Sequence, residues 1–316
     1  MVELPLVVVA DPIDRAALER LRSGPCRVVD ASGDPASLAV QLREATAVIV
    51  RSRTKVTEDL LRAGPRLTLV ARAGVGVDNV DMAAASARGI RVVNAPAAAT
   101  TSVAELTVAL YLLLVRGMVP AIAATRAGRW ERGAHGRELA GKTVGFVGYG
   151  RIGREVARRL EPFGTATIAY DPFVPTAVDR TEVVSWESLL TRSDIVSVHA
   201  ALTRENRHLL DARAFAQMKP GAFLVNVARG PLVDEVALLA ALKSGRLAGA
   251  ALDVFEVEPP VNRELLEHPS VIATPHLGAM TAEGQGRAGA EIVDEVLRAL
   301  RGEPLRALVP APGGRA

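Results

Sequence analysis

The sequence has few aromatic residues, few lysines and a single cysteine. Trp, Tyr and Phe together make up 3% of its 316 residues, so Ala, Val and Leu must build the core. No extended aromatic surface for stacking single-stranded nucleic acid is expected. The 38 basic residues are almost all arginines and are interspersed with 35 acidic ones. Because no basic block stands out, the net charge of +3 predicts no nucleic-acid partner.

The lone Cys26 excludes an internal disulfide and a cysteine metal cluster. It predicts a reducing compartment, which we take to be the cytoplasm, and we predict no metal site. Residues 1–10 have no basic leader before their apolar run, so no secretion signal is expected. The longest apolar run, Leu106–Val115, is too short to span a bilayer, so we predict no membrane partner.

The length suggests two domains, and short β-branched runs alternate with helical patterns in two blocks of the chain. The strands expected are Leu6–Ala10, Arg27–Ala31, Ala47–Val50, Leu67–Ala71, Arg91–Asn94, Thr143–Val147, Ala166–Tyr170, Ile195–His199, Phe223–Val227, Gly249–Val254 and Val271–Thr274. Helix-like segments, such as Ser37–Ala45 and Asp234–Lys243, lie between them. This alternation predicts an α/β protein with two doubly wound parallel sheets covered by helices on both faces.

A long apolar helix is expected between the two blocks. Ser102 and Glu105 have the spacing of a capping box, and apolar residues continue to Val115. The segment is apolar around most of its circumference, which predicts burial between domains or subunits. A last helical pattern, at about residues 281–301, closes the chain.

The segment Gly148-Tyr149-Gly150-Arg151-Ile152-Gly153 fits the dinucleotide-binding pattern G-x-G-x-x-G. The pattern alone is weak in a chain with 27 glycines, but here an apolar strand precedes it and an amphipathic helix follows. Gly148 would permit the tight turn, Gly150 the close approach of the pyrophosphate, and Gly153 the packing of helix on strand. The helix N-terminus would then bind the phosphates.

An acidic residue is expected at the end of the next strand, and Asp171 stands there, followed by Pro172. Its carboxylate would accept hydrogen bonds from the adenosine ribose and repel a 2′-phosphate, which favours NAD over NADP. The alternative for Asp171-Pro172 is a plain turn.

Hydride transfer to or from a 2-hydroxy acid needs a cation for the carboxylate, an acid/base for the hydroxyl, and a carboxylate to orient that acid/base. Arg229, Glu258 and His276 offer these three groups, each just past the carboxyl end of an expected strand. In open α/β sheets ligands bind outside those strand ends. Taken singly, each residue has an ordinary structural alternative as a loop or turn residue.

Three long motifs contain these residues. They are Val225-Asn226-Val227-Ala228-Arg229-Gly230-Pro231-Leu232-Val233-Asp234-Glu235, then Ala251-Leu252-Asp253-Val254-Phe255-Glu256 with Glu258-Pro259-Pro260, and Thr274-Pro275-His276-Leu277-Gly278. In these motifs the chain resembles the D-isomer-specific 2-hydroxyacid dehydrogenases, from about Val48 to Gly289. It most resembles the D-3-phosphoglycerate dehydrogenases, through stretches such as Arg72-Ala73-Gly74-Val75-Gly76-Val77-Asp78-Asn79 and Trp130-Glu131-Arg132.

The resemblance implies a role for each motif residue. Arg229 would bind the substrate carboxylate and carbonyl oxygen, with His276 as acid/base and Glu258 as its partner. The NAD site would include Gly148, Gly150, Arg151, Ile152, Gly153, Asp171, Pro172, Thr203, Val227, Ala228, Asp253 and Gly278. The substrate loops would include Arg51, Ser52, Arg72, Val75, Gly76, Asn94 and Arg132. The arginines among these would hold a phosphate or a second anion.

Some positions depart from the phosphoglycerate dehydrogenase pattern. Ala98-Ala99 replaces the usual Gly-Asn, Met280 replaces a Ser shortly after the catalytic His, and Ala201 replaces a Pro. Alternatives within the family are therefore hydroxypyruvate or glyoxylate reduction and phosphite or phosphonate oxidation, with formate oxidation ranked low. An alternative of another class is an NAD-sensing corepressor-like binding protein.

The resemblance also implies the domain organisation. We expect residues 1–99 with 284–316 to form a discontinuous, flavodoxin-like substrate-binding domain, and 100–283 a Rossmann NAD-binding domain, with a cleft between them. A homodimer is expected, and the chain is too short for the C-terminal regulatory domain of longer relatives. The substrate would be a small anionic 2-hydroxy or 2-oxo acid.

Overall fold

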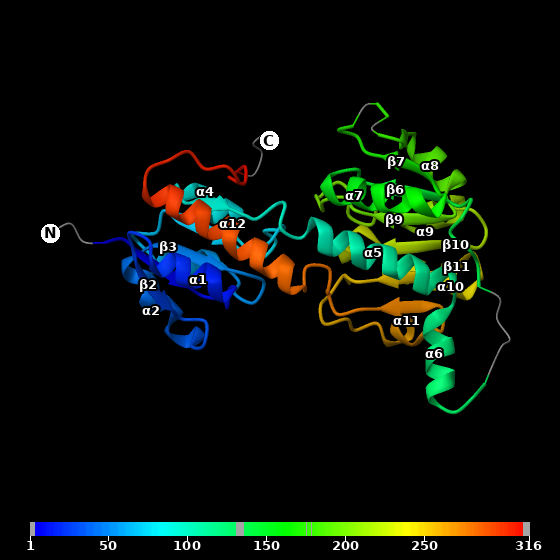
Figure 1. The fold of residues 1–316 in the computed structure, drawn as a ribbon, viewed down its shortest axis with the longest axis horizontal. Coiled ribbons are helices and arrows are strands. Elements are labelled where there is room, and N and C mark those ends of the chain that lie inside the picture. Colours follow the sequence, from blue (N-terminus) through cyan, green and yellow to red (C-terminus); the bar gives the residue numbers. More distant parts are fainter. Residues whose placement is uncertain (1–3, 131–135, 175, 178, 312–316) are drawn as a thin grey trace. The chain divides into compact units, whose positions relative to one another are not determined.

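The computed structural model describes residues 4–130, 136–174, 176–177 and 179–311. The chain divides into two compact units, one formed by Met1–Ala99 with Ala279–Ala316 and the other by Thr100–Gly278. Each unit contains one parallel sheet with helices on both faces, which confirms the predicted fold class (Figure 1). The second boundary lies at 278/279, where we expected 283/284. The turn before the last helix belongs with that helix, because the Gln285 amide donates to the Ala279 carbonyl (2.7 Å).

The sheet of the first unit has the strand order β2-β1-β3-β4-β5, and all neighbours are parallel. Its strands are β1 (Leu6–Val9), β2 (Arg27–Asp30), β3 (Ala45–Val50), β4 (Leu69–Arg72) and β5 (Arg91–Val93). The chain moves from β1 outward to β2 and then crosses to β3, so the topological switch point lies between β1 and β3. The all-apolar β1 is buried throughout because helices cover both of its faces.

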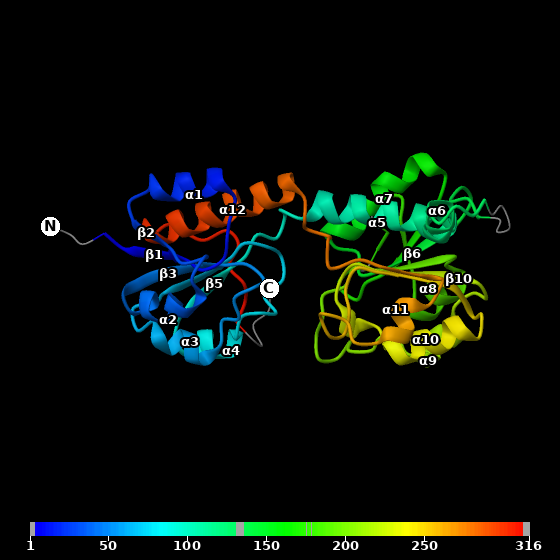
Figure 2. The same cartoon turned by 90° about the horizontal axis from the view of Figure 1, so that it is seen from below.

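Helices of the first unit form two layers on opposite faces of this sheet (Figure 2). One layer is α1 (Arg15–Arg22) with α12 (Ala282–Leu300), and the other is α2 (Leu38–Gln41), α3 (Glu58–Ala63) and α4 (Met82–Ala87). The close contact of α1 with α12 depends on Gly289, where a Cβ atom would lie 2.8 Å from the Ala17 Cβ. The helix expected over Ser37–Ala45 is broken into α2 and two flanking 3₁₀ turns.

The sheet of the second unit has the order β12-β11-β10-β9-β6-β7-β8, again fully parallel. Its strands are β6 (Thr143–Val147), β7 (Ala166–Tyr170), β8 (Glu182–Val183), β9 (Ile195–Val198), β10 (Ala222–Asn226), β11 (Leu247–Leu252) and β12 (Val271–Ala273). The chain runs outward through β7 and β8 and returns to β9, so the switch point lies between β6 and β9.

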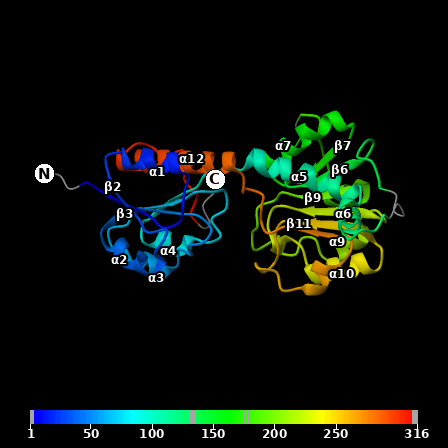
Figure 3. The ribbon, with the colours of Figure 1, turned by 60° about the horizontal axis from the view of Figure 1, so that its bottom comes forward.

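Two helical layers cover the second sheet (Figure 3). One face carries α5 (Thr100–Val115) and α7 (Arg151–Leu160); the other carries α8 (Trp186–Arg192), α9 (Ala212–Gln217) and α10 (Glu235–Lys243). The short helices α6 (Met118–Arg126) and α11 (Arg263–Glu267) complete the unit.

The capping box expected at the start of α5 is wrong. The helix begins two residues before Ser102, so the Ser102 side chain lies buried inside it, and Glu105 pairs with Arg159 of α7 instead (3.5 Å). Within the described ranges, no single helix is long and apolar enough to cross a membrane. Taken together, α5 and α6, with 71° between them, would be long and apolar enough, by length and composition only.

We predict that Ile292→Ala destabilises the first unit. Ile292 is fully buried between α12 and the sheet, and truncation of such a side chain leaves a cavity that costs about 2–5 kcal/mol. Hydrogen–deuterium exchange in peptides from β1 and β3 should therefore accelerate. Val40→Ala, at a side chain that is 58% exposed, is the matched control and should leave exchange unchanged. Equal exchange in both variants would contradict the assignment of Ile292 to the core.

Candidate active site

The carboxyl ends of β10, β11 and β12 lie at one edge of the second sheet because these strands are parallel neighbours. Arg229 follows β10, Glu258 follows β11 and His276 follows β12. The three residues expected to be catalytic are therefore delivered to the same edge.

His276 and Glu258 form a hydrogen-bonded pair. The His276 Nδ1 and the Glu258 Oε2 lie 2.8 Å apart, and the Glu258 Oε1 accepts a hydrogen bond from the Phe255 N–H (3.2 Å). The bond to Glu258 raises the pKa of His276 above its usual value, against the opposing effect of burial. Burial opposes ionisation of Glu258, but the hydrogen bond and charge of His276 outweigh it, so the pKa of Glu258 is lowered. The pair therefore favours a carboxylate and an imidazolium.

The backbone of His276 is held in an unusual conformation. Its φ is +53°, in the left-handed region that non-glycine residues seldom adopt. The buried Asp253 carboxylate accepts hydrogen bonds from the Thr274 hydroxyl (2.6 Å) and from the N–H groups of Leu277 (2.7 Å) and Gly278 (2.8 Å). The His276 N–H donates to the Asp253 carbonyl (2.9 Å). Asp253 thus positions the whole segment, a role that sequence reasoning missed; its expected contact with NAD stays a prediction.

Two hydrogen bonds made by the Asn226 side chain hold the loop that carries Arg229. This fully buried amide donates to the Arg229 carbonyl (3.0 Å) and accepts from the Ala228 N–H (3.1 Å). The charge of Arg229 lowers the pKa of both His276 and Glu258, so the guanidinium acts on the pair electrostatically. A Cβ atom at Gly230 would lie 1.8 Å from the Phe255 carbonyl carbon, so only glycine allows the two loops to pack this closely.

A pocket of about 490 Å³ adjoins the His276–Glu258 pair. Apart from Glu258, Thr274 and His276, its lining is apolar: Phe255, Pro259, Pro260, Leu266, Ala273 and Pro275. Beside these walls 50% of the His276 side chain and 39% of the Glu258 side chain remain exposed, so solvent still reaches the pair.

The glycine motif has the geometry of a phosphate site. Gly148 has φ +88°, and a Cβ atom there would lie 2.6 Å from the Ala200 N; a Cβ at Gly153 would lie 2.9 Å from the Gly148 carbonyl oxygen. Both glycines are explained by packing. Gly150 differs, because no atom outside its two chain neighbours lies within 4 Å of a Cβ built there. Gly150 is also the N-cap of α7, and no side chain caps this helix end. This open space beside free helical N–H groups fits the pyrophosphate of a dinucleotide.

Asp171 stands at the end of β7, beside the glycine motif. Its Oδ2 accepts from the Tyr149 N–H (2.7 Å), and its Oδ1 accepts from the Phe173 N–H (2.9 Å). The bond to the Phe173 N–H closes a tight turn at Asp171-Pro172, which was the alternative interpretation of these two residues. Each oxygen keeps a further lone pair, so the carboxylate can still accept ribose hydroxyls. Pro172 is exposed next to it.

The remaining residues expected at the NAD site lie on the first turn of α7 or in loops that leave the carboxyl edge of this sheet. They are Arg151, Ile152, Thr203, Val227, Ala228 and Gly278. The Thr203 N–H donates to the Asn206 side chain (2.7 Å), which shapes its loop. The described residues contain no group of three or more His, Cys, Asp or Glu side chains that could hold a metal ion.

The residues expected to bind substrate in the first unit also stand at the carboxyl edge of their sheet. Arg51 follows β3, Arg72 ends β4 and Asn94 follows β5, with Ser52, Val75 and Gly76 in the adjoining loops. The buried Asp11 accepts from the Arg51 N–H (2.6 Å) and the Thr54 hydroxyl (2.7 Å). Sequence reasoning missed Asp11, although its place after β1 at the same edge was a signal. Arg132 lies outside the described residues.

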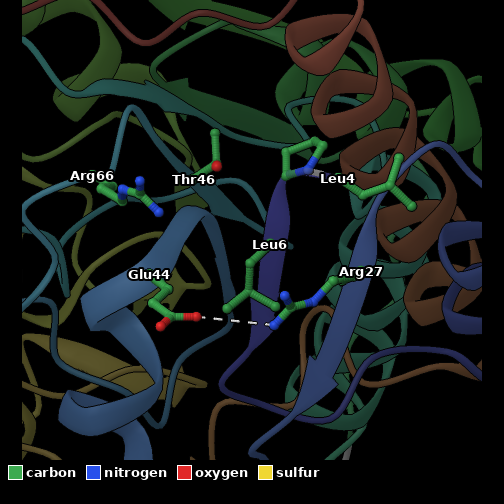
Figure 4. Close-up of a pocket in the computed structure, with 7 residues that line it drawn as sticks. Leu4, Leu6, Arg27, Glu44, Thr46 and Arg66 are labelled. Carbon is green, nitrogen blue, oxygen red and sulfur yellow. Dashed lines mark ion pairs between the residues drawn. The ribbon is translucent and has the colours of Figure 1, made fainter. Parts of the chain in front are cut away.

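A second pocket, of about 270 Å³, lies at the opposite, amino edge of the first sheet (Figure 4). Arg27 faces Glu44 across it (4.0 Å), and Arg66 and Thr46 form another part of the wall. Since Arg51 and Arg72 stand at the carboxyl ends of β3 and β4, this pocket is separate from the expected substrate residues.

We predict that Gly150→Ala weakens NAD binding without loss of stability. The added methyl group meets no described atom beyond its two chain neighbours but occupies the space for the pyrophosphate, so the Kd for NAD⁺ should rise at least about tenfold. Isothermal titration calorimetry would measure this. The matched variant Gly153→Ala should instead lower the melting temperature, because its methyl group would overlap the Gly148 carbonyl. Unchanged NAD⁺ affinity in Gly150→Ala would contradict this use of the motif.

Comparisons with known proteins agree with this geometry. The profile described as "D-isomer specific 2-hydroxyacid dehydrogenase, NAD binding domain" matches residues 108–278. The chain is 46% identical over 317 residues to a D-3-phosphoglycerate dehydrogenase of Mycobacterium leprae, covering 99% of this chain and 60% of the relative. It therefore spans about 60% of that relative's length.

Two further relatives match nearly end to end. A hydroxypyruvate reductase of Thermotoga maritima is 42% identical over 299 residues, covering 93% of this chain and 98% of the relative. The crystal structure of a glyoxylate reductase from Paecilomyes thermophila superimposes with a TM-score of 0.88 at 32% identity, covering 98% and 99% of the two chains. The chain belongs to the D-isomer-specific 2-hydroxyacid dehydrogenase family.

Proposed function

We propose that this protein is an NAD-dependent dehydrogenase that interconverts a small anionic D-2-hydroxy acid and its 2-oxo acid. The observation that carries the proposal is the 2.8 Å bond between His276 and Glu258, placed with Arg229 at one sheet edge. Membership of the family supports the same conclusion. We propose NAD rather than NADP because the Asp171 carboxylate would repel a 2′-phosphate.

In the direction of reduction, NADH supplies the hydride for the 2-oxo carbon. Arg229 holds the substrate carboxylate, since a guanidinium binds a carboxylate with two parallel hydrogen bonds, and its charge polarises the neighbouring carbonyl. His276, protonated because Glu258 stabilises its charge, donates a proton from Nε2 to the carbonyl oxygen. In oxidation the neutral His276 accepts that proton.

The choice of substrate rests on the first unit. Arg51, Arg72 and Asn94 are proposed to hold the distal part of the substrate, which would be 3-phosphoglycerate or a related anion. The Met280 sulfur lies 3.9 Å from the Arg51 Nη2, so a thioether occupies one flank of this guanidinium. This contact, together with the relative that is a hydroxypyruvate reductase, makes hydroxypyruvate or glyoxylate reduction the second candidate.

The oxidation of NADH and NADPH with a panel of 2-oxo acids tests this proposal. 3-Phosphohydroxypyruvate, hydroxypyruvate, glyoxylate and pyruvate should separate the candidates by kcat/KM, and NADH should be preferred. NAD⁺ binding without turnover of any 2-oxo acid would favour a corepressor-like binding protein. Phosphite-dependent reduction of NAD⁺ would reveal the phosphite-type alternative.

We predict a severe loss of turnover in His276→Asn. Asn tolerates the left-handed backbone of position 276, so the fold should be kept, while loss of the general acid lowers kcat about 10²–10⁴-fold. In the wild type, kcat/KM for reduction should fall as pH rises through the raised pKa of His276, and kcat/KM for oxidation should rise there. Stopped-flow rates against pH measure both. Near wild-type turnover in the variant would disprove the assignment.

A homodimer is also proposed. Helix α6 presents Met118, Val119 and Ile122 with 42%, 39% and 44% of their surfaces exposed, next to the apolar α5. We propose that this surface meets a second copy of the chain. The buried, free Cys26 thiol supports the proposed cytoplasmic location, where thiols stay reduced.

We predict that Ile122→Asp disrupts the dimer. A charge in an apolar interface is costly to desolvate, so light scattering after gel filtration should show a dimer for the wild type and a monomer for the variant. Val40→Asp, at another exposed valine in the first unit, should remain dimeric. A monomeric wild type, or a dimeric Ile122→Asp, would contradict the proposed interface.

A further inference from the structure

Two glutamates next to the candidate active site bind each other's backbone. The Glu256 N–H donates to the Glu235 Oε1 (2.7 Å), and the Glu235 N–H donates to the Glu256 Oε1 (3.3 Å). Glu235 begins α10, directly after the Arg229 loop, and Glu256 follows β11, two residues before Glu258. The reciprocal bonds therefore join the loop of Arg229 to the loop of Glu258.

Two basic side chains hold the outer oxygen of Glu256. The His208 Nε2 lies 2.8 Å and the Arg207 Nη2 lies 3.0 Å from the Glu256 Oε2. His208 has φ +53°, and its N–H donates to the Pro231 carbonyl (2.8 Å). The 207–208 turn thus contacts both loops, through Glu256 and through Pro231.

The two loops are also in direct contact at Gly230, where the backbone approaches Phe255 too closely for any side chain. This contact is independent of the glutamates and fixes the same pair of loops. Four groups then surround the junction: the carboxylates of Glu235 and Glu256 and the cations of Arg207 and, when protonated, His208. We call these four residues the loop clasp.

The clasp keeps two carboxyl groups close together in a half-buried place. Burial raises the pKa of Glu235; the hydrogen bond from the Glu256 N–H lowers it and the negative charge of Glu256 raises it, so that the net pKa is raised. The contacts of Arg207 and His208 with the Glu256 Oε2 offset the repulsion between the two carboxylates. The clasp is therefore a local polar network that fixes the separation of the two loops.

We propose that Glu256 is a positioning residue, which through the loop clasp sets Arg229 relative to the His276–Glu258 pair. The expected effect of Glu256 on catalysis rests on the proposed function, whereas its effect on the position of the His276–Glu258 pair does not. None of the four clasp residues is assigned a contact with the reacting atoms.

Loss of the Glu256 carboxylate should release the 255–258 loop. The Glu258 side chain would then leave the His276 Nδ1 for part of the time, and the imidazolium would lose its main support. The pKa of His276 should fall toward the ordinary value of about 6.5. Arg229 would also be placed less accurately, so kcat should fall more than the affinity for NAD.

An NMR titration of the His276 ring in the whole protein, without ligand, tests the geometric part. The signal is assigned with His276→Asn. In Glu256→Ala we expect the pKa of His276 to fall by about half to one pH unit, and kcat/KM of the 2-oxo acid to fall about tenfold, with the Kd for NAD⁺ within twofold of wild type. Glu256→Gln keeps the Oε1 acceptor for Glu235 but loses the carboxylate oxygen that Arg207 and His208 contact, so both values should lie between those of the wild type and Glu256→Ala.

The matched control is Glu264→Ala, which removes an exposed ion pair with Lys243 in the same unit and should change neither value. If Glu256→Ala fails to fold, His208→Asn provides the test, because Asn tolerates the left-handed backbone at position 208. It should lower the pKa of His276 in the same direction. An unchanged His276 pKa in the folded variants overturns the proposal. A wild type that reduces no 2-oxo acid while its His276 pKa responds to Glu256→Ala overturns only the proposed function.

Discussion

The candidate active site depends on one buried carboxylate, that of Asp253. It lies at the end of β11 and accepts three hydrogen bonds from residues 274–278, so the loop after β12 is held to its neighbouring strand. Together with the bond from the His276 N–H to the Asp253 carbonyl, these bonds compensate for the strain of the left-handed backbone of His276. The position of the imidazole, its bond to Glu258 and the raised pKa of His276 all follow from this attachment.

A second set of contacts positions Arg229 and Glu258, the partners of His276. Asn226 holds the backbone at Arg229, and the clasp around Glu256 joins that loop to the one carrying Glu258. The three proposed catalytic side chains thus share a support made of the buried Asn226 and Asp253 and the half-buried clasp. Such networks specify a single arrangement when every member is satisfied, which suits a site where small displacements reduce the rate.

The sequence predicted what depends on spacing along the chain. The glycine motif, Asp171 and the three strand-end residues are local features, and parallel strands bring their carboxyl ends together. It did not predict Asp253 as a support, the Glu235–Glu256 exchange or the role of Asp11, because each joins loops far apart in sequence. The expected capping box at Ser102 was wrong because a spacing pattern does not locate the first turn of a helix, and the two-residue β8 carried too little pattern to be found.

The most direct test of the account is the proton uptake that accompanies binding of oxamate, a 2-oxo acid analogue, to the protein loaded with NADH. Titration calorimetry in two buffers of different ionisation enthalpy measures it at a pH above the pKa of His276 in the free protein. Because His276 must be protonated to donate to the analogue's oxygen, we expect uptake of close to one proton in the wild type and none in His276→Asn. Equal uptake in the two proteins, or none in the wild type, would contradict the role of His276 as the proton donor.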